Sequence, residues 1–225
     1  FILFIIPSVL VSIAFAPILL TIVPTPAFDT TKPMTLKELY NVSPLGVVGM
    51  FLLGGVFSAQ FGMAAVYGGK ANLTIGQISL FVSAFYVGAL IMQYPLGWMS
   101  DRMDRRVLIL GSAVLGGVAA TFTVFWGDNF TFLLITAFII GGTSNPLYSL
   151  FLAYTNDFLE HEDMAAASGG MVFVSGLGAI SGPIITGWLM STLGAWAFFG
   201  VISALMLAIA AYAAFRMTQR SSPSV

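Results

Sequence analysis

The sequence predicts an all-α membrane protein with seven transmembrane helices, and composition and charge placement carry that prediction. Of the 225 residues, 58% are hydrophobic and only 8% are charged, and the mean hydropathy is +0.97. An ordinary soluble domain carries about 25% charged residues. A soluble fold of this composition would expose a large apolar surface to water, whereas a lipid bilayer matches such a surface.

Seven apolar stretches reach the length of about 20 residues that a helix needs to cross a bilayer. Within them, no Asp, Glu, Lys, Arg or His lies far from an end. The predicted spans are 1–23, 45–68, 76–99, 107–126, 130–154, 166–190 and 195–215.

The first stretch begins without Met and without the basic segment of a signal peptide, so we expect a chain cut inside or just before a membrane span. The connection that follows, 24–44, is the longest and is rich in proline. Within it, Leu36 to Tyr40 fits either a short amphipathic helix at the membrane surface or an ordinary linker turn.

Basic residues predict the sidedness of the spans. Counting alternate sides, seven of the eight bases fall on one face of the membrane and only Lys70 falls on the other. The positive-inside rule places the seven in the cytoplasm, which puts the C-terminus there too. The seven are Lys32, Lys37, Arg102, Arg105, Arg106, Arg216 and Arg220.

The loop after the third span carries a recognisable motif. Residues 97–106 have the sequence GWMSDRMDRR, which resembles the G-x-x-x-D-R-x-G-R-R signature of the major facilitator superfamily. Asp104 stands where that signature has glycine, as is typical of the more degenerate second copy. The matching residues, predicted to form a gating motif, are Gly97, Asp101, Arg102, Arg105 and Arg106.

Each part of this motif has a physical rationale. Glycine at position 97 permits two helices to approach closely. Asp101 at a helix end can pair with an arginine or with the N-terminus of a neighbouring helix, and such a pair can latch one state of a carrier. The other interpretation is a plain positive-inside loop with no gating role.

The resemblance implies a division of the chain. Residues 1–23 would be the last helix of an N-terminal half that is otherwise missing, 24–44 a cytoplasmic linker, 45–217 the six-helix C-terminal half, and 218–225 a cytoplasmic tail. The stretches 37–46 and 145–150, with Ala153 and the Asn156-Asp157 pair, further resemble the YcaD-like branch of bacterial inner-membrane permeases.

Polar and aromatic residues inside the spans predict a transport path. Carriers of this type bind solute near the bilayer midplane between two halves. Seven-residue spacing places several of these side chains on common helical stripes, and others flank Pro146. The tentative path residues are Gln60, Tyr67, Tyr86, Gln93, Asn145 and Tyr148. For each, the alternative is a hydrogen bond that joins two helices.

Small residues predict where helices pack closely or bend. A four-residue repeat marks the span 45–68, and glycines crowd the span 166–190 around a proline. The residues assigned to packing or to a hinge are Gly54, Ser58, Gly62, Gly178, Gly182 and Pro183.

Other classes of function find little support. The sequence has no cysteine and one histidine, His161 in a loop, so we predict no catalytic residue, no metal site and no cofactor. It has no basic patch for nucleic acid. The predicted function is transport of a small solute across the cell inner membrane by alternating access. Alternatives are a non-catalytic subunit of a larger membrane complex or, less favoured, an intramembrane enzyme.

Overall fold

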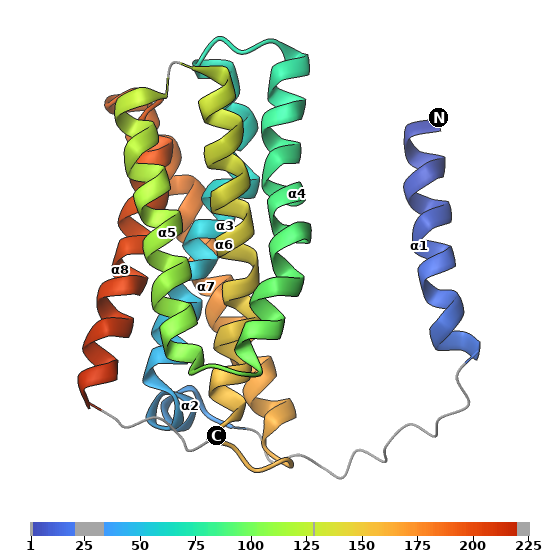
Figure 1. The fold of residues 1–225 in the computed structure, drawn as a ribbon, viewed down its shortest axis with the longest axis vertical. Helices are drawn as coiled ribbons and strands as arrows, with labels where there is room; N and C mark the ends of the chain where they lie inside the picture. The colour runs from blue at the N-terminus through green and yellow to red at the C-terminus, as the bar shows by residue number, and fades with distance from the viewer. Residues whose placement is uncertain (1, 21–33, 128, 220–225) are drawn as a thin grey trace. The chain divides into compact units, whose positions relative to one another are not determined.

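The computed structural model describes residues 2–20, 34–127 and 129–219, and its regular secondary structure there is entirely helical. The chain forms two compact units, Phe1–Thr31 and Lys32–Val225. The helices are α1 (Ile2–Leu20), α2 (Leu36–Val42), α3 (Pro44–Lys70), α4 (Ile75–Ser100), α5 (Arg105–Trp126), α6 (Phe130–Asn156), α7 (Met164–Thr192) and α8 (Ala197–Gln219) (Figure 1).

The first unit contributes a single apolar helix, α1, of 19 residues. At 1.5 Å per residue it is about 28 Å long, close to the thickness of the hydrocarbon core of a bilayer. It corresponds to the predicted span 1–23, of which residues 1 and 21–23 lie outside the described part of the chain. Residues 24–33 of the predicted linker and 220–225 of the predicted tail lie outside it as well. The apolar stretch of α1, Phe4–Pro17, is shorter than those of α3 to α8, so a seventh crossing stays a prediction.

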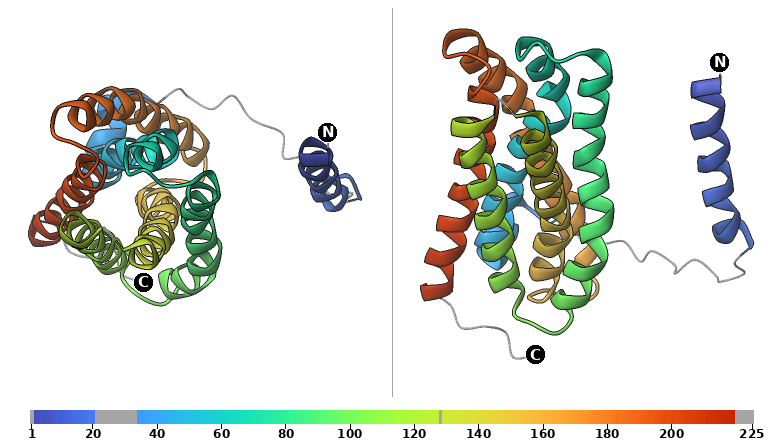
Figure 2. Two further views of the ribbon diagram at one scale, coloured as in Figure 1. Left: turned by 90° about the horizontal axis from the view of Figure 1, so that it is seen from above. Right: turned by 45° about the horizontal axis from the view of Figure 1, so that its top comes forward.

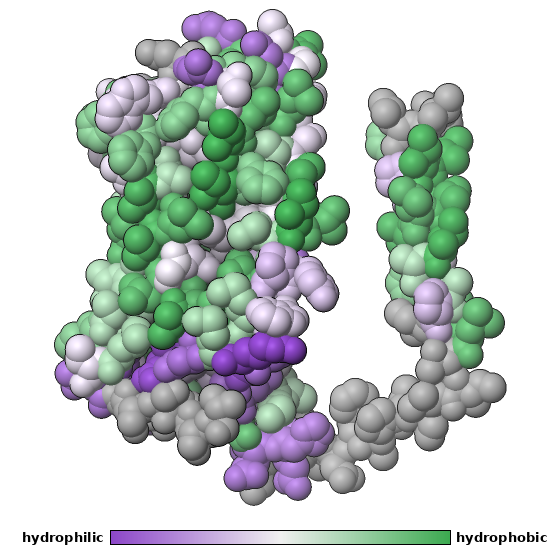
Figure 3. Space-filling model, in the orientation of Figure 1, coloured by the Kyte–Doolittle hydropathy of each residue, from purple (hydrophilic) through white to green (hydrophobic). Residues whose placement is uncertain are grey.

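The second unit contains the other predicted spans. Helices α3 to α8 are each long and apolar enough to cross a membrane, which confirms the prediction of an all-α fold with a six-helix half. Consecutive helices run in opposite directions (Figure 1). An apolar belt occupies the middle of the unit, and hydrophilic residues gather toward its ends (Figure 3).

One end of this unit carries most of the ionisable side chains, and we call it the charged end. It comprises α2, the α4–α5 loop, the α6–α7 loop and the last turn of α8. The described bases there are Lys37, Arg102, Arg105, Arg106 and Arg216, whereas Lys70 ends α3 at the opposite, far end. This distribution agrees with the predicted alternation of loops across the membrane.

Helix pairing follows a repeated scheme. Helix α3 packs mainly against α7, and α4 packs mainly against α6; α5 lies between α6 and α8, and α3 also meets α8 (Figure 2). These pairings are preserved when α3, α4 and α5 are exchanged for α6, α7 and α8. Helices α4 and α7 are the least buried of the six, with 17% and 22% of their apolar stretches covered.

Glycines make the two main helix pairs possible. A Cβ atom at Gly54 would overlap the carbonyl oxygen of Ser175 in α7, and one at Gly178 would overlap that of Phe51 in α3. In the pair of α4 and α6, Gly88 and Gly141 face the partner's backbone in the same way. Such contacts let backbones approach without a side chain between them, which is how helices pack where water supplies no driving force.

The remaining small residues that the sequence singled out also lie between α3 and α7. A Cβ atom at Gly182 would overlap the Ser58 hydroxyl group. At Gly62 it would lie 3.7 Å from Cγ of Pro183, an ordinary van der Waals contact. Helix α7 continues through Pro183 as one helix, and the role of Gly182 and Pro183 as a hinge stays a prediction.

The segment Leu36–Val42 of the predicted linker forms the short helix α2, which favours a helix over a linker turn, and its place at the membrane surface stays a prediction. Its N-terminus has a capping box: the Thr35 backbone N–H donates to the Glu38 carboxylate at 2.8 Å, and the Glu38 N–H donates to the Thr35 hydroxyl at 3.3 Å. These hydrogen bonds hold the pKa of Glu38 below its usual range. Leu39 is buried and lies against Gly170 of α7, so α2 docks on the unit by its apolar face.

Replacing one packing glycine tests the importance of the close approach. Gly178→Ala is expected to destabilise the protein by about 1–3 kcal/mol, because the new methyl group has no space beside the α3 backbone. The matched control is Gly176→Ala, since a Cβ atom there meets nothing within 4 Å. The control should be neutral or stabilising by up to about 1 kcal/mol, because alanine favours the helix.

The measurement is the thermal unfolding midpoint of each purified variant in the same detergent. Equal midpoints for the two variants would contradict the packing role of Gly178.

Candidate functional site

The predicted gating loop is a tight turn at the charged end. Helix α4 ends at Ser100 and α5 begins at Arg105, so residues 101–104 make the whole connection. Asp104 has φ −58° and ψ 116°, which any L-amino acid adopts, so this position does not require the glycine of the signature. Its carboxylate instead accepts a hydrogen bond from the Arg106 N–H at 2.9 Å and caps α5.

Three arginines of the motif are held by neighbours within the unit. Arg106 is buried, and its guanidinium group pairs with the Asp104 carboxylate at 2.7 Å. The Arg102 guanidinium carbon lies 4.1 Å from the ring centre of Trp98 in a cation–π contact. Arg105 forms an ion pair with Asp157 at the end of α6 and also donates to the Ser100 hydroxyl group.

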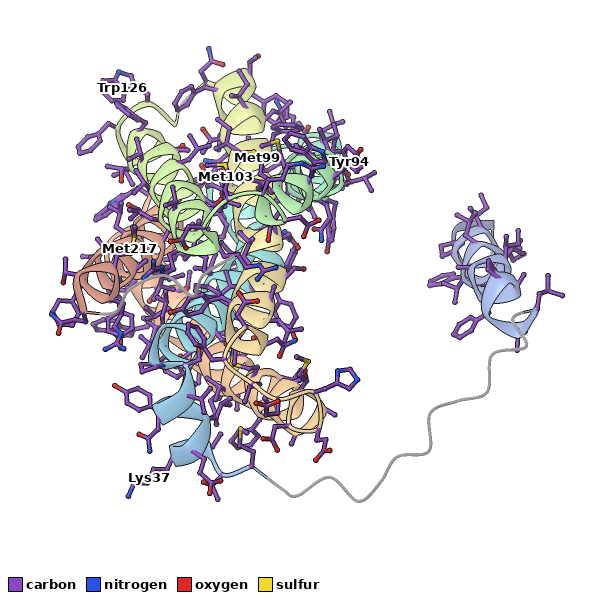
Figure 4. All side chains as sticks on the ribbon, turned by 60° about the horizontal axis from the view of Figure 1, so that its bottom comes forward. Lys37, Tyr94, Met99, Met103, Trp126 and Met217 are labelled. Carbon is purple, nitrogen blue, oxygen red and sulfur yellow. The ribbon has the colours of Figure 1, made fainter. Side chains whose placement is uncertain are left out.

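The ion pair of Arg105 and Asp157 joins the two loops of the charged end. Asp157 is the C-cap of α6, where the helix dipole disfavours a negative charge. The guanidinium group of Arg105 offsets that effect and ties the start of α5 to the end of α6. In Figure 4 the charged end comes forward, and Met103 lies in the α4–α5 loop close to Met99 of α4.

Asp101 and Gly97 differ from the rest of the motif. Asp101 is exposed at the C-terminal end of α4, and no ion pair to it occurs within residues 34–127 and 129–219. A Cβ atom at Gly97 would meet nothing within 4 Å. No neighbouring helix of the described unit covers that face of α4, so the close helix approach at Gly97 stays a prediction.

Aromatic side chains from three helices form a continuous row in the unit. We call Tyr148, Phe57, Phe61 and Tyr86 the ring ladder. The ring centroids lie 6.4 Å apart for Tyr148 and Phe57, 5.8 Å for Phe57 and Phe61, and 5.1 Å for Phe61 and Tyr86. Phe61 and Tyr86 are 39% and 56% exposed, while the other two rings are half-buried.

Two amide side chains occur on α4 and α6, the helices that supply Tyr86 and Tyr148 of the ring ladder. The Gln93 side chain is exposed, and its amide nitrogen lies 3.5 Å from the Ser149 hydroxyl oxygen. Asn145 is half-buried and donates to the Gly141 carbonyl oxygen in its own helix at 3.1 Å. The neighbouring Tyr94 is 80% exposed and points outward from α4 (Figure 4).

Two residues predicted for the path lie inside the unit instead. Gln60 is fully buried, and its carbonyl oxygen accepts a hydrogen bond from the Ser144 hydroxyl group at 2.8 Å. Tyr67 is 5% exposed and stacks on Phe198 at 4.9 Å. Their seven-residue spacing correctly gives a shared stripe of α3, but that stripe turns toward α6 and α8 rather than toward an open face.

Some residues of this site escaped the sequence interpretation. Phe57, Phe61, Ser144 and Ser149 were not singled out, although Phe57 and Phe61 are four residues apart and so share one face of α3. Aromatic residues are common in the spans, and only their packing across helices separates the ring ladder from the buried aromatic cluster around Tyr67.

The described residues also bear on whether the protein could bind a metal ion. Within them, no group of three or more His, Cys, Asp or Glu side chains is placed to hold a metal ion. His161 is exposed in the α6–α7 loop.

These observations define the chain as part of a multi-pass integral membrane protein built from antiparallel helices. The family model of the Major Facilitator Superfamily matches residues 45–225. The chain belongs to this superfamily of transporters.

The relatives agree with the predicted branch. The chain is 26% identical over 175 residues to the uncharacterized MFS-type transporter YfkF of Bacillus subtilis (strain 168), covering 75% of this chain and 44% of YfkF. It is 23% identical over 170 residues to the uncharacterized MFS-type transporter YcaD of Escherichia coli (strain K12 / DH10B), covering 72% and 41%. The predicted YcaD-like resemblance is confirmed, and the chain spans less than half the length of either relative.

A solved structure has the same fold. The auto-inhibited POT family peptide transporter superposes with a TM-score of 0.68 at 13% sequence identity, over 82% of this chain and 38% of that one. At this identity the similarity concerns the fold alone.

A double-mutant cycle tests the ion pair that joins the two loops. Arg105→Ala and Asp157→Ala are expected to couple by about 0.5–1 kcal/mol in unfolding free energy, because the pair is only partly shielded from water. The coupling should fall as salt is added. The matched control cycle combines Arg102→Ala with Asp157→Ala, since Arg102 contacts Trp98 instead. An equally large coupling free energy in the control cycle would show that the effect comes from the overall charge of this end and not from the pair of Arg105 and Asp157.

Proposed function

We propose that the full-length protein to which this chain belongs carries a small solute across the cell inner membrane by alternating access. The observation that carries this proposal is the ring ladder with its flanking amides, exposed on helices whose other sides are packed or apolar. The hydroxyl groups of Tyr86 and Tyr148 and the amide of Gln93 are unfavourable against lipid, so this surface is expected to border a second half of the protein or a solute path.

The proposed partner of this unit is the other half of the same protein. Family relatives are more than twice as long as the stretch that this chain matches. Helices α4 and α7, the least buried of the six, are the expected contact surfaces. The path residues that we retain are Tyr86, Gln93, Asn145 and Tyr148.

The proposed orientation places the charged end in the cytoplasm, because that end carries the basic loops. Asp101 is then the part of the motif that reaches the other half. Its carboxylate lies at a helix C-terminus, where the dipole disfavours it, and it lacks a cationic partner in the described unit. A positive group from the other half would stabilise it in the state that is closed to the cytoplasm.

The function itself is tested by solute uptake into vesicles that contain the purified full-length protein. Solutes that accumulate in the parent strain but not in a deletion strain supply the panel. Saturable uptake of one of them supports a carrier. Absence of uptake, together with copurification of an ATPase, would favour a subunit of a larger complex.

Charge reversal tests the proposed role of Asp101. Asp101→Lys is expected to lower uptake about tenfold or more, because coupling between two conformational states is typically about 1–3 kcal/mol. Membrane insertion should be unchanged, since this side chain is exposed and makes no ion pair in the described unit. The control is Glu160→Lys, an exposed acid of the α6–α7 loop. Normal uptake by the Asp101 variant would remove it from the gate.

The amide of Gln93 is expected to contact solute. Gln93→Ala should raise the apparent KM for the transported solute about two- to tenfold, the equivalent of one hydrogen bond. The control is Gln77→Ala, because that amide caps the far end of α4 by accepting from Thr74. An unchanged KM in the Gln93 variant would indicate that the contact of Gln93 with Ser149 only joins α4 to α6.

A further inference from the structure

We propose that the ring ladder selects solutes that carry a planar aromatic ring and no net negative charge. The inference rests on the proposed transport function and deepens it by naming the class of substrate. The evidence is the geometry of the four rings, the distribution of charge in the unit, and the weak contact of the neighbouring amide.

The ladder has the geometry of a stacking surface. Tyr148 and Phe57 are inclined by 29°, and Phe61 and Tyr86 by 28°, so both pairs are close to parallel. The centroid distances of these two pairs, 6.4 and 5.1 Å, fall in the range of offset aromatic stacking, whereas the Phe57–Phe61 pair between them is tilted by 43° at 5.8 Å. A flat ring laid beside Tyr86 and Phe61 would extend this row.

The exposure of the ladder separates it from core packing. The aromatic cluster of Tyr67, Phe81, Phe198 and Phe199 has similar ring distances, yet each of its members is at most 5% exposed. The ladder keeps Phe61 and Tyr86 accessible at one end. Packing in the core accounts for the buried cluster, whereas the rings of Phe61 and Tyr86 in the ladder remain exposed.

The charge distribution defines which solutes this surface accepts. In the described parts of α3 to α8, Asp, Glu, Lys, Arg and His side chains occur only near helix ends. An anion beside the ladder would therefore lose its hydration without gaining a cationic partner. The face of an aromatic ring carries a partial negative charge, which repels anions and attracts cations. Neutral and cationic aromatic solutes fit this surface.

The Gln93 amide, two helical turns from Tyr86 on α4, adds a polar group to the same stripe of that helix. Its 3.5 Å separation from the Ser149 hydroxyl group is at the weak end of the hydrogen-bond range. A solute that offers a better partner would displace this contact at little cost. The preferred solute therefore also carries a hydrogen-bonding group away from its ring.

The test measures binding to the full-length protein in lipid nanodiscs by calorimetric titration of four probes. Tryptamine is a cationic aromatic, indole is neutral, indole-3-acetate is the anion, and 2-cyclohexylethylamine is a cation without an aromatic ring. Tryptamine and indole are expected to bind, tryptamine more tightly. The anion and the non-aromatic amine are expected to bind at least about tenfold more weakly than tryptamine, a difference of about 1.4 kcal/mol.

Ring variants connect the selectivity to the ladder. Phe61→Leu and Tyr86→Leu should each weaken tryptamine binding about three- to tenfold, the value of one aromatic contact. Tyr86→Phe keeps the ring and should retain most of the affinity. The matched control is Phe122→Leu, because Phe122 is 49% exposed on α5 and its ring partner is Trp126, outside the ladder.

The inference is overturned if 2-cyclohexylethylamine binds as tightly as tryptamine, or if both leucine variants bind tryptamine like the unaltered protein. If Phe61→Leu fails to fold, the comparison of Tyr86→Leu with Tyr86→Phe decides, since Tyr86 is more than half exposed. Failure of the proposed function looks different: tryptamine would bind through the ladder while vesicles showed no saturable uptake of any solute, which leaves the aromatic selectivity intact.

Discussion

Lipid imposes the constraint on which this structure depends: each backbone N–H and C=O group at membrane depth needs a hydrogen-bond partner inside the protein. Helices α3 to α8 meet it with their own hydrogen bonds, and the chain reverses direction only at their ends. Charged side chains share that restriction, so they gather where the loops are. The charged end of the unit, with its ion pair of Arg105 and Asp157 and its buried Arg106, follows from this separation.

Because apolar surfaces gain nothing by leaving lipid for one another, close backbone contact holds the helices together. Gly54 and Gly178 provide it for α3 and α7, and Gly88 with Gly141 provides it for α4 and α6. The two contacts are equivalent under exchange of the first three helices for the last three, which fits the internal repeats of major facilitator proteins. This arrangement leaves α4 and α7 with their outer faces uncovered, and it brings Phe57, Phe61, Tyr86 and Tyr148 into one row across three helices.

The residues of the signature loop fall into two groups. Some make contacts within the described unit, and others do not. Asp104 caps α5, Arg106 pairs with Asp104, and Arg105 joins two loops. Gly97 and Asp101 have no such neighbour in the described unit. The first group maintains the turn, and the second group has no structural role within the described unit.

The sequence by itself determined the six helices α3 to α8, because length, hydropathy and the placement of charge are properties of each segment alone, and the motif of the α4–α5 loop indicated the superfamily. It also placed the small residues of α3 and α7 correctly on their helices. Only the tertiary structure decided which stripe of a helix is covered. Gln60 and Tyr67 share a stripe, as their spacing requires, but α6 and α8 bury it. Phe57 and Phe61 became a candidate site only through Tyr86 and Tyr148 on other helices. The physical reason is that a helical repeat fixes relative angles within one helix, whereas the rotation of that helix toward its neighbours depends on the packing of all six.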